Sequence, residues 1–95
     1  MRLTPFEIDA IKQSASEVFG PEVEVRLFGS RVDDAKRGGD IDLYIKAAAG
    51  QDLAHKISFL LALEGRVGEQ KIDLVFALNT DRPIEREALR TGIAL

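Results

Sequence analysis

The segment from Leu27 to Ile45 reads LFGSRVDDAKRGGDIDLYI and ends in an alternating pattern. Its last six residues fall into two phases: Asp40, Asp42 and Tyr44 in one, and Ile41, Leu43 and Ile45 in the other. Successive side chains of a β-strand point to opposite faces, so the pattern predicts a half-buried strand whose isoleucines and leucine face the core. Both aspartates then stand side by side on the open face. Aspartate is depleted in strands, so this pair requires an explanation.

Three further strands, one of them a brief edge strand, and three helices are predicted on either side of this segment. Alternation predicts strands over 23–27 and 72–76 and a brief edge strand at 93–95. Thr4, Pro5 and Glu7 form a helix start with a capping box, and Gly20-Pro21 ends that helix. Asp52 is the expected cap of a second helix, and residues 83–91 are expected to form a third.

The second helix has two apolar stripes at helical spacing. We expect Leu53, Ile57, Leu60 and Leu61 to form its core face. Phe59 and Leu63 form a stripe beside it, which is interpreted as additional core or, if exposed, as a partner surface. The element order predicts one α+β domain over residues 1–95, with helices packed on one face of a small sheet.

Composition excludes several classes of protein. No apolar run reaches the roughly 20 residues that a membrane-spanning helix needs, and no signal-peptide pattern is visible. The net charge is −3 with no basic stripe, which argues against nucleic acid as the main partner. The absence of cysteine fits a reducing compartment, so we expect a cytoplasmic protein.

Asp73 lies in the phase of the later strand that matches Asp40 and Asp42. If the two strands pair, three carboxylates gather on one patch and repel one another. A divalent cation removes that difficulty, and Mg²⁺ prefers carboxylate oxygens, water and phosphate as ligands. The pattern therefore indicates Mg²⁺ and a phosphate-containing substrate. The alternative is a pair of solvated strand faces without a ligand.

Gly29 and Ser30 follow the first strand directly. A glycine here lets the backbone approach a phosphate, and the Ser30 hydroxyl can bind one or cap a short helix. Arg31 is a candidate to neutralise a triphosphate, with Lys36 and Arg37 as further candidates. An ordinary turn and a solvated charged loop are the alternatives. Arg26 and Lys71 share the open-face phase and are also candidates for contact with substrate.

Together, LFGSR, GGDIDLYI, KIDLVF and the closing IEREALRTGIAL resemble the minimal nucleotidyltransferase domains of the DNA polymerase beta superfamily. The resemblance implies a palm-like mixed sheet with helices and a site with two Mg²⁺ ions. It implies that Asp40 and Asp42 bind the metals, that Asp73 completes one site and helps to activate the attacking hydroxyl, and that Gly29 and Ser30 hold the nucleoside triphosphate. Two features depart from the pattern. The spacer between Ser30 and Asp40 is one residue shorter than usual, and residues 32–34 replace a familiar phosphate-side arginine.

Three functions remain open from the sequence. The resemblance implies an antitoxin paired with a helical HEPN-type toxin, which transfers AMP from ATP to a hydroxyl of that partner. A domain of this size has little room for its own acceptor pocket, which also favours an acceptor on a protein. The alternatives are an antitoxin that acts by contact alone and a nucleotide-sensing module without acceptor chemistry.

Overall fold

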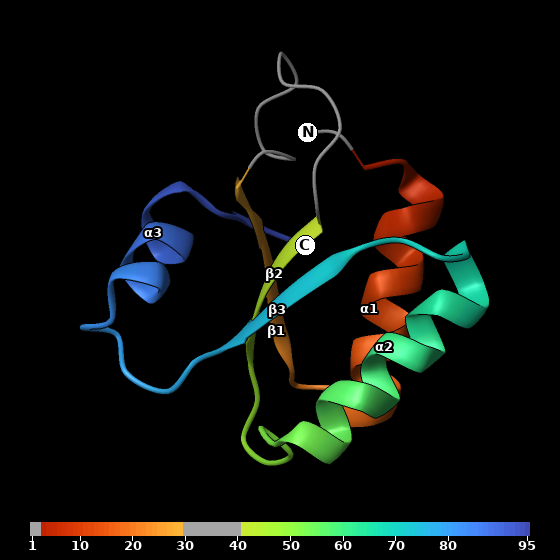
Figure 1. The fold of residues 1–95 in the computed structure, drawn as a ribbon, viewed down its shortest axis with the longest axis horizontal. Helices are drawn as coiled ribbons and strands as arrows, with labels where there is room; N and C mark the ends of the chain where they lie inside the picture. Colours follow the sequence, from red (N-terminus) through yellow and green to blue (C-terminus); the bar gives the residue numbers. More distant parts are fainter. Residues whose placement is uncertain (1–2, 30–40) are drawn as a thin grey trace.

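The computed structural model describes residues 3–29 and 41–95. A four-stranded sheet lies between helices on either side (Figure 1). The elements are α1 (Pro5–Phe19), β1 (Glu24–Phe28), β2 (Ile41–Lys46), α2 (Leu53–Val67), β3 (Ile72–Phe76), α3 (Pro83–Thr91) and β4 (Ile93–Ala94). Each helix and strand predicted within these ranges is present within one or two residues of its expected bounds, and the short helix that Ser30 could cap lies outside them.

Side-chain caps account for where the two long helices begin. The Thr4 hydroxyl accepts from the Glu7 amide at 3.1 Å, and the Glu7 carboxylate accepts from the Thr4 amide at 3.0 Å. This is the capping box predicted for α1. The carboxylate of Asp52 accepts from the His55 amide at 2.9 Å and caps α2 in the same way.

The sheet is mixed, with strand order β3-β2-β1-β4. β2 runs antiparallel to β1 and parallel to β3, while β4 runs antiparallel to β1 on its other side. The parallel pair is possible because α2 forms the crossover between β2 and β3. This is the α+β class and the small mixed sheet that the sequence and its resemblance predicted.

The main core lies between the sheet and the antiparallel pair α1 and α2. Ile41, Leu43 and Ile45 are almost fully buried there, as their alternation predicted. On β1, Val25 and Leu27 face the same core. The core face of the sheet is therefore the face assigned to it from the sequence.

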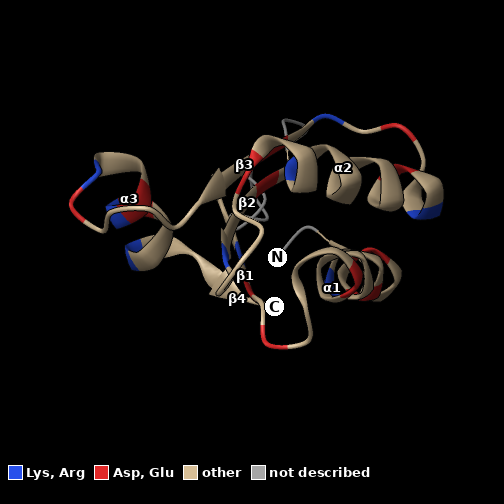
Figure 2. Cartoon of the chain, turned by 90° about the horizontal axis from the view of Figure 1, so that it is seen from below, with Lys and Arg blue, Asp and Glu red and all other residues tan. Residues whose placement is uncertain are grey.

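The third helix differs from the prediction that helices pack on one face. α3 covers the opposite face of the sheet, where Ala88 packs against Phe28 and Tyr44 (Figure 2). The expectation of a single helical layer is correct for α1 and α2 and wrong for α3. The physical reason is that Phe28 and Tyr44 place apolar area on the open face, and a short helix buries it.

The core face assigned to α2 is corrected in part: Leu60 packs against the main core as expected, and the interpretation of Phe59 and Leu63 as additional core is confirmed. Phe59 and Leu63 are fully buried, whereas Leu53, Ile57 and Leu61 are 69, 48 and 64% exposed. Both sets have the spacing of one helix face, and the set that contains Phe59 is buried because its aromatic ring packs in the core. The Phe59 ring lies 5.8 Å from that of Phe19 on α1, inside the main core. Leu53, Ile57 and Leu61, here called the α2 stripe, lie on the outer surface of the helix.

Among the described residues, no helix is both long and apolar enough to span a bilayer.

Candidate active site

The structure brings Asp42 and Asp73 together at one end of the sheet. They are register partners on the parallel strands β2 and β3, so their Cα atoms lie on neighbouring strands roughly 5 Å apart. Paired positions project side chains to the same face, and for these two it is the face opposite the main core. Asp42 is half-buried and Asp73 is exposed. The shared phase read from the sequence therefore corresponds to direct juxtaposition.

Gly29 lies immediately beside Asp42. Its φ of +78° is a conformation that residues with a side chain rarely adopt. A Cβ atom added at Gly29 would lie 2.2 Å from an Asp42 carboxylate oxygen. The sequence suggested that glycine is needed here so that the backbone can approach a phosphate. The structure supplies another reason, since only glycine leaves room for the Asp42 carboxylate in this position.

The two carboxylates create a local concentration of negative charge. Within residues 3–29 and 41–95, no hydrogen bond or ion pair involves the Asp73 side chain. Like charges on directly opposed strand positions destabilise a sheet unless a cation compensates them. The donor set suits Mg²⁺, because both residues supply hard carboxylate oxygens on an accessible face. No group of three or more metal-ligating side chains occurs within the described residues, and Asp40 lies outside them.

Several predicted site residues lie outside the described residues. These are Ser30, Arg31 and Asp40, together with Lys36 and Arg37. Their assigned roles therefore stay predictions. The described part of the predicted site consists of Gly29, Asp42 and Asp73, together with the two further candidates for substrate contact, Arg26 opposite Tyr44 on β1 and Lys71 just before β3.

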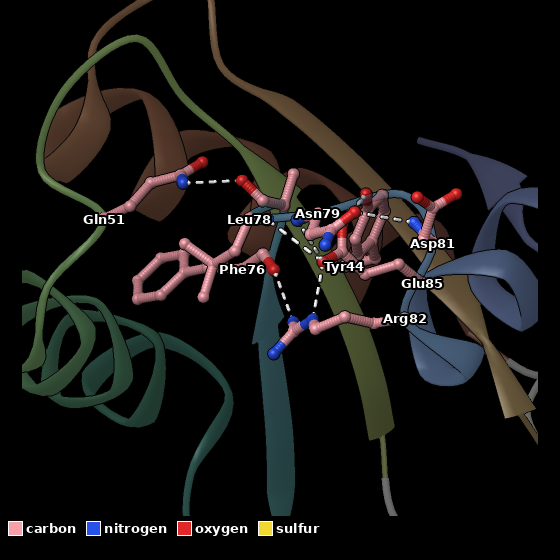
Figure 3. A network of polar contacts seen from close by, with 9 residues as sticks. Tyr44, Gln51, Phe76, Leu78, Asn79, Asp81, Arg82 and Glu85 are labelled. Carbon is pink, nitrogen blue, oxygen red and sulfur yellow. Dashed lines mark hydrogen bonds and ion pairs between the residues drawn. The ribbon is translucent and has the colours of Figure 1, made fainter.

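A third carboxylate, that of Glu85, lies on the same face of the sheet but farther from this site. It is fully buried at the third position of α3. The Tyr44 hydroxyl donates to it at 2.6 Å, the Asn79 amide and the Arg82 Nε each donate at 2.7 Å, and the Leu78 amide donates at 3.1 Å (Figure 3). These contacts fasten α3 to β2 and to the segment that follows β3.

The network shifts the pKa values of both of its acidic groups. Burial raises the pKa of Glu85, but the hydrogen bonds from Tyr44, Asn79, Arg82 and Leu78 outweigh burial and lower it to about 2. Burial, reinforced by the hydrogen bond to Glu85 and by its charge, raises the pKa of Tyr44 to about 12. Glu85 is therefore an ionised and structurally satisfied carboxylate.

Sequence reasoning did not identify Glu85. Tyr44, which shares the phase of Asp40 and Asp42, has its side chain buried against α3. A weak signal for Glu85 existed, because a glutamate at the third position of a helix often accepts backbone hydrogen bonds. The His55 ring stacks on that of Phe19, and its Nδ1 lies 2.7 Å from an Asp52 carboxylate oxygen.

Comparison with known proteins adds one finding. The family model described as "Polymerase beta, Nucleotidyltransferase" matches residues 10–95. No curated protein matches the sequence at a significant level. The family match spans the whole of the sheet and all of the residues predicted for the site.

Proposed function

The chain belongs to the polymerase beta nucleotidyltransferase family, and on this premise we propose that it transfers AMP from ATP to an acceptor hydroxyl in a Mg²⁺-dependent reaction. The acceptor belongs to a partner protein, and the pair works as a toxin and its antitoxin. Residues 1–95 act in this proposal as a single minimal nucleotidyltransferase domain in the cytoplasm.

The observation that supports the proposal best is the register pairing of Asp42 with Asp73 beside Gly29. Structural carboxylates are normally matched by donors of the protein itself, as Glu85 is. Asp73 is exposed, and no described residue pairs with it. An accessible carboxylate pair of this kind suits an external cation and a phosphate-containing substrate.

The proposed roles follow from these positions. Asp42, Asp73 and Asp40 would hold Mg²⁺, which when bound supplies positive charge to the triphosphate oxygens. Gly29 and Ser30 would bind the triphosphate, and Arg31 would neutralise part of its charge. The acceptor oxygen bonds to the α-phosphorus and its proton passes to Asp73. The bond from the α-phosphorus to the bridging oxygen breaks, and pyrophosphate leaves with that electron pair.

The α2 stripe supports a protein as the acceptor. Leu53, Ile57 and Leu61 lie exposed at successive turns of α2. Exposed apolar residues at this spacing are typical of a helix face that packs against another helix. We propose that the helical partner covers this stripe, on the α1 and α2 side of the sheet, and reaches around the edge strand β3 to present its hydroxyl to the acid pair on the opposite face.

The direct test uses the full chain, Mg²⁺, ATP labelled at the α-phosphate, and the product of the neighbouring gene. We expect label on the partner and release of one pyrophosphate for each AMP transferred. Asp42→Asn with Asp73→Asn should abolish both signals. Asp9→Asn is the matched control and should leave both signals unchanged, because Asp9 is exposed on α1, on the other side of the sheet from the acid pair.

Label transfer that is equal in the wild type and in the double variant would remove the catalytic assignment. Neutralisation of the toxin that survives loss of the acids would instead favour the second candidate, an antitoxin that acts by contact through the α2 stripe. ATP binding without pyrophosphate release, in the presence of the partner, would favour a nucleotide-sensing module.

A further inference from the structure

A cavity of about 340 Å³ opens on the α3 side of the sheet, and neither Asp42 nor Asp73 lines it. Its floor is formed by the far ends of β1 and β2, and its walls by α3 and the segment after β3. This volume falls in the lower part of the range for small-molecule sites. It therefore has room for a small ligand of its own.

The cavity is separate from the candidate active site. Lys46 lines it and lies four residues along β2 from Asp42, which corresponds to about 13 Å. Ala88 of α3 packs on Phe28 and Tyr44 between these two ends. The reaction proposed above makes no use of this cavity.

Arg26 is the main recognition group in the cavity. Its half-buried guanidinium has five N–H donors. Among the described residues its one hydrogen bond goes to the Gly92 carbonyl, at a long 3.4 Å. A partly desolvated guanidinium with most of its donors available favours a carboxylate, which it can bind through two parallel hydrogen bonds.

The surrounding charges favour a ligand with a single negative charge. Lys46 adds a second cation, and Glu24 is its register partner across the strands. No salt bridge joins these two within the described part of the chain. The charge of Glu85 is matched by its ion pair with Arg82. Two cations and one unmatched carboxylate leave a net charge of +1, which suits a monoanion.

The opposite wall is apolar. Leu78 and Leu89 both line the cavity, where they can contact a ligand, and they are 65 and 42% exposed. Covering them with an apolar group removes this area from water. A ligand with a carboxylate at one end and a short apolar group at the other would satisfy both walls.

We propose that this cavity is a second ligand site, which binds a small monoanionic carboxylate that has a short apolar group. Arg26 and Lys46 bind the carboxylate, and Leu78 and Leu89 contact the apolar group. The inference does not depend on the transfer reaction, and it stands or falls with its own experiment.

The test is an NMR titration of the nitrogen-15-labelled full chain with isocaproate, a branched short-chain carboxylate. We expect saturable shifts of the amides in the 77–80 segment and at Arg26 and Leu89. The neutral isocaproamide has the same shape and should bind at least about tenfold more weakly, because it lacks the charge that Arg26 pairs with. Asp42→Asn with Asp73→Asn should leave the titration unchanged.

Two variants test the recognition groups. Arg26→Met should weaken isocaproate binding about tenfold, and the exposed Lys46→Met should weaken it severalfold without any effect on folding. Arg90→Met is the matched control, because Arg90 is exposed on α3 and does not line the cavity. Equal binding of acid and amide, wild-type affinity in both cavity variants, or shifts confined to Gly29, Asp42 and Asp73 would overturn the proposal. So would the absence of saturable shifts in the wild type.

Discussion

The same face of one sheet holds two kinds of carboxylate. Glu85 is fully buried, and the protein itself supplies four hydrogen-bond donors to it. Asp73 is exposed beside Asp42, and no described residue pairs with it. Burial of a charge is tolerated only when the protein supplies its partners, whereas an exposed carboxylate such as Asp73 can bind a cation from solution. The difference separates a carboxylate that stabilises the fold from one that is available for chemistry.

The largest expected effect concerns activity rather than stability. Asp42→Asn or Asp73→Asn alone should lower AMP transfer by at least about 100-fold, because each removes charge at the reacting centre. Asp73→Asn should not lower the melting temperature in the absence of Mg²⁺, since it relieves repulsion with Asp42. Label transfer and thermal unfolding, measured on the same preparations, check both parts. Loss of stability in proportion to loss of activity would show that these aspartates, like Glu85, mainly stabilise the fold, and would contradict this prediction.

Glu85→Ala should have the opposite profile. It leaves the Tyr44 hydroxyl, two backbone amides and Arg82 without their shared acceptor, at a cost of about 3 kcal/mol in the free energy of unfolding. Urea unfolding measures this. Glu87→Ala is the control on the same helix, because its exposed pair with Arg90 contributes less than about 1 kcal/mol. Equal effects of the two substitutions would contradict the structural role of Glu85.

Gly29→Ala tests the contact between the backbone turn and Asp42. The strained φ costs about 1 kcal/mol, and the added Cβ displaces the Asp42 carboxylate, so transfer should fall about tenfold. Gly68→Ala has a similar φ of +84° and open space around its Cβ, so it should lose stability without losing activity. Comparison of the two variants separates backbone strain from displacement of Asp42. An equal loss of activity in both would show that the contact with Asp42 is irrelevant.

The last prediction concerns the pH dependence of stability at the Glu85 end. The folded pKa of Glu85, about 2, lies below its ordinary value of 4.5. Its contribution to stability is therefore fully present above pH 4.5 and is lost as the pH falls toward 2. The stability difference between the wild type and Glu85→Gln should shrink over this window, as measured by urea unfolding at each pH. A constant difference across it would contradict the lowered pKa.

Strand faces were predictable because alternation is a local property. Ile41, Leu43 and Ile45 had to share one face, so Asp42 had to take the other, and the phase of Asp73 followed in the same way. Pairing two such strands then places the carboxylates together whenever the register matches. The faces of the two strands therefore needed no knowledge of distant contacts, whereas the pairing of β2 with β3 that joins the carboxylates did.

Other features depend on contacts between distant residues. The two stripes of α2 have the same spacing, and packing against α1 and the sheet, including the ring of Phe19, buries Phe59 and leaves Leu61 exposed. Glu85 meets Tyr44 across 41 residues of sequence, and neither residue signals the other locally. The side of the sheet that α3 covers follows from the same contact.

Thermal unfolding with Mg²⁺ and ATP tests most directly whether Asp42 and Asp73 form a metal and nucleotide site. A ligand at 100 times its dissociation constant stabilises the folded state by about 2.7 kcal/mol, which raises the melting temperature of a domain of this size by roughly 10 °C or more. We predict such a rise for the wild type and for Asp9→Asn, and none for Asp42→Asn with Asp73→Asn. An equal rise in the double variant, or no rise in the wild type, would contradict the account.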